Sequence, residues 1–271
     1  MKKLVDGDAS VDIAPERGGM VSRFAIGARE VFYLDQATFD DPSKNVRGGN
    51  PVLFPSPGPL ANERFAWGGR SGSMKQHGFA RNRPWRIADE TDKSATLELA
   101  SDDVTRAQFP WDFVVRLHHQ LSGSRLRIEQ RVENKSDAPM PFAFGFHPYF
   151  AVRDADKAKT KIPTTAKRAF DNVTKKEIDV AGPIDLTQKE VDLHLFDHGR
   201  SDARLELADG KLVVVRASSE YRRWVIWTLA GKDFVCLEPW TAGADALNRE
   251  RDVLVVAPRE TKELFIEIEA A

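Results

Sequence analysis

The chain has 271 residues, of which 41% are hydrophobic and 30% charged, and its formal net charge at pH 7 is −1. A chain of this length can bury a large core, and its nearly balanced charges (40 Lys and Arg, 41 Asp and Glu) exclude an overall field that attracts nucleic acid or an anionic membrane. Its single cysteine, Cys236, excludes an internal disulfide and a metal site made of several thiolates, so a neutral or weakly charged small molecule is the expected partner.

The first residues do not have the pattern of a signal peptide or a membrane anchor. Asp6 and Asp8 interrupt any apolar run after the N-terminal lysines. No later run reaches the roughly 20 apolar residues that a membrane helix needs. We therefore expect a cytoplasmic protein.

Strand patterns begin early in the chain. Residues 21–27 and 29–35 surround a Gly-Ala turn and predict a hairpin, and residues 38–49 predict a loop. Residues 51–85 are rich in proline and glycine, which predicts loops joining short strands. This stretch also holds Arg64, His77 and Arg81, and irregular backbone that carries selected polar groups is typical of a binding site.

The clearest pattern lies between residues 111 and 133. Apolar and polar residues alternate on both sides of a Ser-Gly-Ser turn, which predicts an antiparallel hairpin with one buried face. The buried face should carry Leu117, Leu121, Leu126 and Ile128. Arg116, Arg125 and Arg127 should face solvent or a polar cleft.

The second half of the chain continues as strands. Residues 203–209, 211–218, 222–230, 234–240 and 263–269 show extended patterns, whereas the charge-rich residues 154–161 and 167–176 predict surface loops. No long amphipathic helix and no alternation of strands with helices is evident. The chain is therefore expected to form a single all-β domain over residues 1–271, as a sandwich or a barrel.

Three residues stand where strand patterns do not favour them. His77 follows a glutamine before a glycine, His147 lies in the apolar segment PFAFGFHPYF, and Glu238 lies in CLEPW. A carboxylate in apolar surroundings must be paired, hydrogen-bonded or protonated, so convergence of these three side chains would supply an acid and a base. The alternative is that each is an ordinary core or strand-end residue.

The sequence positions of the remaining histidines and of the cysteine indicate structural roles. His118 and His119 point to opposite faces of the hairpin, so they cannot serve one site together. His194 and His198 are predicted to lie in a polar loop and to be exposed to solvent. Cys236 shares a strand face with Glu238, but no neighbour in the sequence would activate its thiol, so inert packing is expected.

Four segments together resemble the aldose 1-epimerase (galactose mutarotase-like) family. They are PVLFPSPGPLANERF, QHGFARNRPW, GFHPYF and CLEPWTAGADALN, and the resemblance extends from Gly48 to about Asn248. It implies a large antiparallel β-sandwich, an isomerase activity on a sugar substrate, and no cofactor or metal. It does not indicate an oligomeric state.

The resemblance also implies roles for particular residues. Glu238 matches the family's general base and His147 its acid, while His77 matches a histidine that hydrogen-bonds the reacting oxygens. Arg64 matches the arginine that holds sugar hydroxyls, and Asp197 is nominated as the sugar-binding aspartate with Asp192 as a rival. Arg81 and Trp240 are further substrate-binding candidates, the indole for packing on the apolar face of the sugar.

The expected reaction is interconversion of the α and β anomers of a free hexose. Three alternatives remain open. Two histidines and a glutamate are also the ligands of a catalytic metal site, and a sandwich can be a non-catalytic carbohydrate-binding module. HGFARN followed by Trp85 also resembles the hexose-6-phosphate mutarotase branch, for which Lys75, Arg81, Arg83 and Arg86 would be the phosphate-binding candidates.

Overall fold

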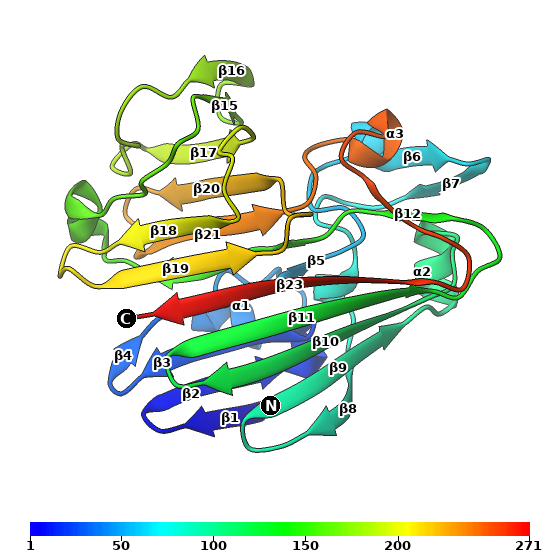
Figure 1. Cartoon of the computed structure of the whole chain (residues 1–271), viewed down its shortest axis with the longest axis horizontal. Coiled ribbons are helices and arrows are strands. Elements are labelled where there is room, and N and C mark those ends of the chain that lie inside the picture. The colour runs from blue at the N-terminus through cyan, green and yellow to red at the C-terminus, as the bar shows by residue number, and fades with distance from the viewer.

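Two large antiparallel sheets packed face to face form the centre of the molecule, as the computed structural model of residues 1–271 shows (Figure 1). Apolar side chains from both sheets join one continuous buried core. The expected all-β antiparallel sandwich is confirmed. None of the helices has the length and apolar character that a membrane-spanning helix requires.

The first large sheet has seven strands in the order β18-β19-β23-β11-β10-β9-β8. It crosses the front of Figure 1, and the C-terminal strand runs through its middle. The strands are β8 (Arg86–Glu90), β9 (Ser94–Ala100), β10 (Phe113–Ser122), β11 (Arg125–Asn134), β18 (Asp202–Glu206), β19 (Leu212–Ala217) and β23 (Thr261–Ala270).

The second large sheet has eight strands in the order β16-β15-β17-β20-β21-β13-β5, with β14 also paired to β21. Its strands come from three separate parts of the chain. They are β5 (Val52–Leu53), β13 (Gly145–Phe146), β14 (Tyr149–Ala151), β15 (Arg168–Asp171), β16 (Lys176–Asp179), β17 (Glu190–Leu195), β20 (Arg223–Leu229) and β21 (Phe234–Trp240).

Smaller elements complete the fold. A four-stranded sheet contains β1 (Lys2–Asp6), β2 (Ala9–Ala14), β3 (Met20–Ile26) and β4 (Arg29–Glu30), and two-stranded pairs join β6 (Arg64–Trp67) to β7 (Arg70–Ser73) and β12 (Met140–Phe142) to β22 (Leu254–Val256). The helices are α1 (Gln36–Asp40), α2 (Asp103–Gln108) and α3 (Ala246–Arg249), with 3₁₀ turns at Pro15–Arg17, Ala61–Glu63, Ala80–Asn82 and Asp154–Lys159.

The hairpins predicted from the sequence are present. β10 and β11 pair from Phe113 opposite Asn134 to Ser122 opposite Arg125. The predicted buried residues Leu117, Leu121, Leu126 and Ile128 are all within the core. β3 and β4 likewise pair around the predicted Gly-Ala turn.

Two segments predicted as surface loops are more ordered than their charges suggested. Residues 168–171 form β15, which lies between β16 and β17 and buries Ala169 while Arg168 is exposed. Within residues 154–161, Lys157 is buried because its Nζ donates to the Leu229 carbonyl at 2.7 Å and to Asp154 at 2.9 Å. Both charged segments therefore lie against strands of the second sheet that are distant in sequence, and contacts with those strands order them.

Candidate active site

A cavity of about 370 Å³ lies over the face of the second sheet that is turned away from the core. On β21, Val235 and Leu237 enter the core, so the alternation of the strand directs Glu238 to the opposite face. The lining residues come from four strands of the sheet (β14, β17, β20 and β21) and from loops beside it. They are Asn45, Val46, Arg47, Gln76, His77, Arg81, His147, Tyr149, Asn172, Asp192, His194, Val225, Trp227, Glu238 and Trp240.

Strand register assembles the floor of this cavity. His194 on β17 lies opposite Val225 on β20, and Val225 lies opposite Glu238 on β21. The neighbouring row contains Asp192 opposite Trp227 in the same way. Residues from three strands therefore share one surface, although they are far apart in sequence.

His147 and Glu238 form a buried pair of titratable groups in the cavity. Nδ1 of His147 lies 3.4 Å from Oε1 of Glu238, and this nitrogen is buried with no hydrogen-bond partner. The other carboxylate oxygen accepts a hydrogen bond of 3.0 Å from the indole of Trp240. The imidazole stacks on Tyr149 with ring centroids 4.6 Å apart, which fixes its plane.

Burial shifts both members of the pair towards their neutral forms. It raises the pKa of Glu238 well above its usual value, and the negative charge of Asp192 raises it further. Burial also lowers the pKa of His147 well below its usual value, with additional effects from His77 and Arg81. Buried acid and base groups with opposite shifts are typical of acid–base catalytic sites.

His77 is held in a strained conformation beside this pair. Its φ is +75°, a left-handed value uncommon for a residue with a side chain, and such strain is concentrated at functional sites. Its Nδ1 donates to the Pro57 carbonyl at 2.7 Å, so Nε2 is the unprotonated nitrogen. Burial, followed by the charge of the nearby Arg81, lowers the pKa of His77 to about 3.

The residue after His77 must be glycine, because a Cβ at Gly78 would lie 2.1 Å from the Phe54 carbonyl oxygen.

A second polar group occupies the β17 side of the cavity. Asp192 accepts a hydrogen bond of 2.6 Å from the amide of Asn172, and its other oxygen lies 3.2 Å from Nε2 of His194. His194 also contacts the edge of Trp240. The expectation that His194 is exposed is wrong, because β17 continues through this polar segment and turns His194 inward.

The expectation that His198 is exposed is also wrong, although His198 does not lie near Glu238. It is buried beside Trp224, outside the cavity that contains Glu238. Its polar sequence neighbours gave no sign of this, because burial comes from the ring of Trp224 on another strand.

Two arginines enter the cavity without an acidic partner. Arg81 comes from the HGFAR segment, and its Nε is buried without a hydrogen bond. The guanidinium of Arg47 lies over the ring of Trp227 at 5.8 Å from the centroid. Neither is in an ion pair, and Arg47 was not foreseen because its loop carries no recognisable motif.

Five of the seven predicted site residues therefore line one cavity, namely His77, Arg81, His147, Glu238 and Trp240. Arg64 does not line it, because β6 and β7 form a separate hairpin in which Arg64 is exposed and borders a different depression. Asp197 also lies outside, where its carboxylate accepts from the backbone N–H groups of Lys167 and Arg168 at 3.1 and 3.2 Å.

The predicted phosphate-binding cluster does not assemble either. Arg83 pairs with Asp102, and Arg86 pairs with Glu98 at 2.6 Å. Lys75 is exposed, and of the four candidates only Arg81 lines the cavity.

Comparisons with known proteins agree with this architecture. The sequence profile of the aldose 1-epimerase family matches residues 37–268. The crystal structure of Slr1438 protein from Synechocystis sp. PCC 6803 is 35% identical and superposes with a TM-score of 0.95, over 100% of this chain and 95% of that one. A galactose mutarotase-like protein from Lactobacillus casei is 20% identical and shares the fold with a TM-score of 0.84, over 100% of both chains. A Cenchrus ciliaris relative with the provisional name glucose-6-phosphate 1-epimerase is 24% identical over 85% of this chain and 68% of its own.

Proposed function

The chain belongs to the aldose 1-epimerase family, a family of isomerases, and from this premise we propose that it interconverts the α and β anomers of a free hexose. The observation that carries the proposal is the buried pair of His147 and Glu238, 3.4 Å apart in the wall of one cavity. A matched acid and base would be unnecessary for binding alone, so the pair favours turnover over a purely sugar-binding role.

In the proposed reaction, Glu238 removes the proton of the anomeric hydroxyl while His147 protonates the ring oxygen. The bond between the anomeric carbon and the ring oxygen breaks and leaves an open-chain aldehyde. Rotation about C1–C2 then presents the other carbonyl face to the same hydroxyl. Closure returns both protons, so the enzyme is regenerated with its roles reversed in the second half of the cycle.

The shifted pKa values suit this exchange of roles. Since burial favours neutral His147 and protonated Glu238, the pair resists holding two separate charges before substrate binds. Moving one proton from Oε1 to Nδ1 over 3.4 Å creates the carboxylate base and the imidazolium acid together. A carboxylate with a raised pKa is also a stronger base than an ordinary one.

The other cavity residues are assigned to substrate binding. Nε2 of His77 can accept a hydrogen bond from a hydroxyl because Nδ1 already carries the proton. Asp192 and Asn172 offer a carboxylate and an amide to ring hydroxyls, which replaces the role first expected of Asp197. Trp240 provides an apolar surface for one face of the sugar.

The direct test is magnetisation exchange between anomers in NMR spectra of glucose and galactose. The enzyme should accelerate the exchange of at least one free hexose in the presence of a chelator. No acceleration of either free hexose or its 6-phosphate would contradict the proposed function.

A second candidate is an aldose carrying a phosphate. The observation that favours it is the presence of Arg47 and Arg81 in the cavity without carboxylate partners, since paired guanidinium groups bind phosphate well. A dianionic substrate would offset the charges of the half-buried Arg81 and the exposed Arg47.

The two candidates are distinguished by kcat/KM for a hexose and for its 6-phosphate, measured at two ionic strengths. We expect the free hexose to be preferred. A preference of tenfold or more for the phosphate, equal to about 1.4 kcal/mol, would favour the second candidate. Loss of that preference in Arg47→Ala, with Arg86→Ala as a matched surface control, would place the phosphate in the cavity.

A further inference from the structure

Three metal-binding atoms of different chemical type converge at the floor of the cavity. A ring nitrogen of His147, Sγ of Cys236 and a carboxylate oxygen of Glu238 all lie within 4.8 Å of one another, and Nδ1 of His147 is the nitrogen that lies 3.4 Å from Glu238. Cys236 and Glu238 are two residues apart on β21 and therefore point to the same face. Tyr149 pairs with Cys236 across β14 and stacks on His147, which brings the imidazole over the thiol.

The polar contacts of this cluster are incomplete. His147 is 9% exposed, yet its Nδ1 has no hydrogen-bond partner although it lies beside the thiol and the carboxylate. Cys236 is fully buried, so its sulfur is not exposed to solvent. A buried nitrogen without a partner is costly, and an atom placed between the three donors would satisfy it.

We propose that His147, Cys236 and Glu238 form a binding site for a thiophilic divalent cation such as Zn²⁺ or Cd²⁺, and that its occupancy blocks epimerisation. One imidazole, one thiolate and one carboxylate are all ligand types that zinc uses, and sulfur disfavours Mg²⁺ and Ca²⁺. The bound cation would occupy the base and the acid at once. This inhibitory site goes beyond the proposed function, and its binding half does not depend on that function.

The geometry requires only a small adjustment. With zinc bonds of about 2.0–2.3 Å, donor atoms of a tetrahedral site lie about 3.5 Å apart. His147 and Glu238 are already at 3.4 Å, so rotation of the Cys236 and Glu238 side chains would complete the set. A water molecule from the cavity would supply the fourth ligand.

The protons released on binding compensate for the repulsion between a cation and the nearby arginines. Arg47 and Arg81 oppose an isolated cation, and both lie close enough to lower the pKa of His147. Binding, however, releases the Cys236 proton and the Glu238 proton to solvent, leaving one thiolate and one carboxylate. A divalent ion then makes the cluster neutral, so the net charge facing the two arginines does not increase.

The single cysteine makes the test specific. Cd²⁺ added to the intact protein should produce one thiolate-to-cadmium charge-transfer band in the ultraviolet and should inhibit anomer exchange over the same concentration range. His147→Ala and Glu238→Gln should each weaken Cd²⁺ binding, measured by this band, by about tenfold or more. His118→Ala, a histidine outside the cavity, is the matched control and should leave the binding unchanged.

Cys236→Ala tests the inhibition. It should retain basal activity and lose sensitivity to Cd²⁺, and Cys236→Ser serves the same purpose if the alanine variant does not fold. Absence of the band, equal Cd²⁺ affinity in His147→Ala, or equal inhibition of Cys236→Ala would each overturn the proposal. Activation rather than inhibition by Zn²⁺ would also overturn it.

Should the wild-type protein show no epimerase activity on any hexose, the proposed function fails, but the band and its dependence on His147 still decide whether the cation site exists.

Discussion

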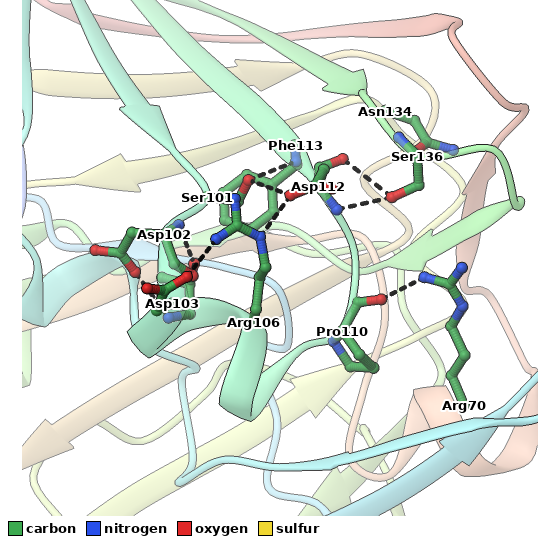
Figure 2. A network of polar contacts seen from close by, with 11 residues as sticks. Arg70, Ser101, Asp102, Asp103, Arg106, Pro110, Asp112, Phe113, Asn134 and Ser136 are labelled. Carbon is green, nitrogen blue, oxygen red and sulfur yellow. Dashed lines mark hydrogen bonds and ion pairs between the residues drawn. The ribbon is translucent and has the colours of Figure 1, made fainter.

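Two polar clusters in this molecule have opposite character. The first lies where β10 begins, and Figure 2 shows its side chains meeting in a closed network. Asp112 accepts from Nε of Arg106 at 2.6 Å and from the Ser101 hydroxyl at 3.2 Å, while its backbone N–H donates to the Ser136 hydroxyl at 2.7 Å. Asn134 then accepts from the Ser136 backbone at 2.9 Å.

The same region begins α2 with reciprocal capping bonds. The Asp102 carboxylate accepts from the Thr105 backbone at 2.8 Å, and the Thr105 hydroxyl accepts from the Asp102 backbone at 2.8 Å. Asn134 is fully buried, and its amide donates to the carbonyls of Ala138 and Val256 at 2.8 and 3.0 Å. The donors and acceptors of this network satisfy one another, so its role is to join strands and loops.

The cavity over β21 is the second cluster, and several of its groups have no protein partner. Nδ1 of His147 and Nε of Arg81 are buried without hydrogen bonds, and Arg47 forms no ion pair. A polar group left unsatisfied by folding is available to a ligand. The two clusters therefore differ in how completely their polar groups are paired, and the incompletely paired one lines the cavity.

The largest expected effect is on the base. Glu238→Gln keeps the shape of the side chain but cannot accept a proton, so kcat should fall by about 10²–10⁴-fold.

The same variant has a predicted effect on stability. The folded-state pKa of Glu238 is raised, so the contribution of its protonation to the stability of the fold is present below pH 4.5 and is lost as pH rises through the folded-state pKa. The variant should therefore be at least as stable as the wild type at pH 8, as measured by thermal unfolding. Full activity would refute the mechanism.

A comparable loss is expected when the acid is removed. His147→Ala should lower kcat by about 10²–10⁴-fold, because the ring oxygen would no longer receive a proton in the transition state. His119→Ala is the matched control, since His119 is also buried but lies in the hairpin of the first sheet. That control should lower the stability and leave kcat unchanged, and a similar loss of kcat in both variants would assign the effect to folding.

A substitution in the closed network around Asp112 and Asn134 should lower stability without lowering turnover. Asn134→Ala removes hydrogen bonds to the carbonyls of Ala138, Val256 and Ala257 and the acceptor of the Ser136 N–H, so the free energy of unfolding should fall by about 1–3 kcal/mol. Denaturant unfolding measures this loss, and kcat of the folded fraction should not change. A stable variant with reduced turnover would break the distinction between the clusters.

The smallest effect concerns pH dependence. In the proposed mechanism Glu238 and His147 share one proton, and its loss to solvent would leave no acid, so kcat/KM should fall as pH rises through the raised pKa of Glu238. Asp192→Asn removes a negative charge that raises this pKa, which should move the basic limb of the profile to lower pH. A limb that remains in place would show that Asp192 acts only on the substrate.

Local patterns in the sequence determined the all-β class and the central hairpin. Alternation between Phe113 and Glu133 predicts which side chains are buried, because the period of a strand is set by its own backbone. The motifs around His77, His147 and Glu238 identified residues whose side chains do meet in one cavity. Each stands out because a titratable side chain interrupts an apolar or glycine-rich segment.

Tertiary structure alone decided which other residues join them. Asp192 and His194 reach Glu238 only through the register of β17, β20 and β21, and no short-range pattern specifies which strands become neighbours. The path of the backbone likewise places Arg64 on a separate hairpin outside the cavity and places Arg47, from a loop, in the cavity lining. Residue type and spacing could locate the proton-transfer groups, but only folding placed the groups that surround them.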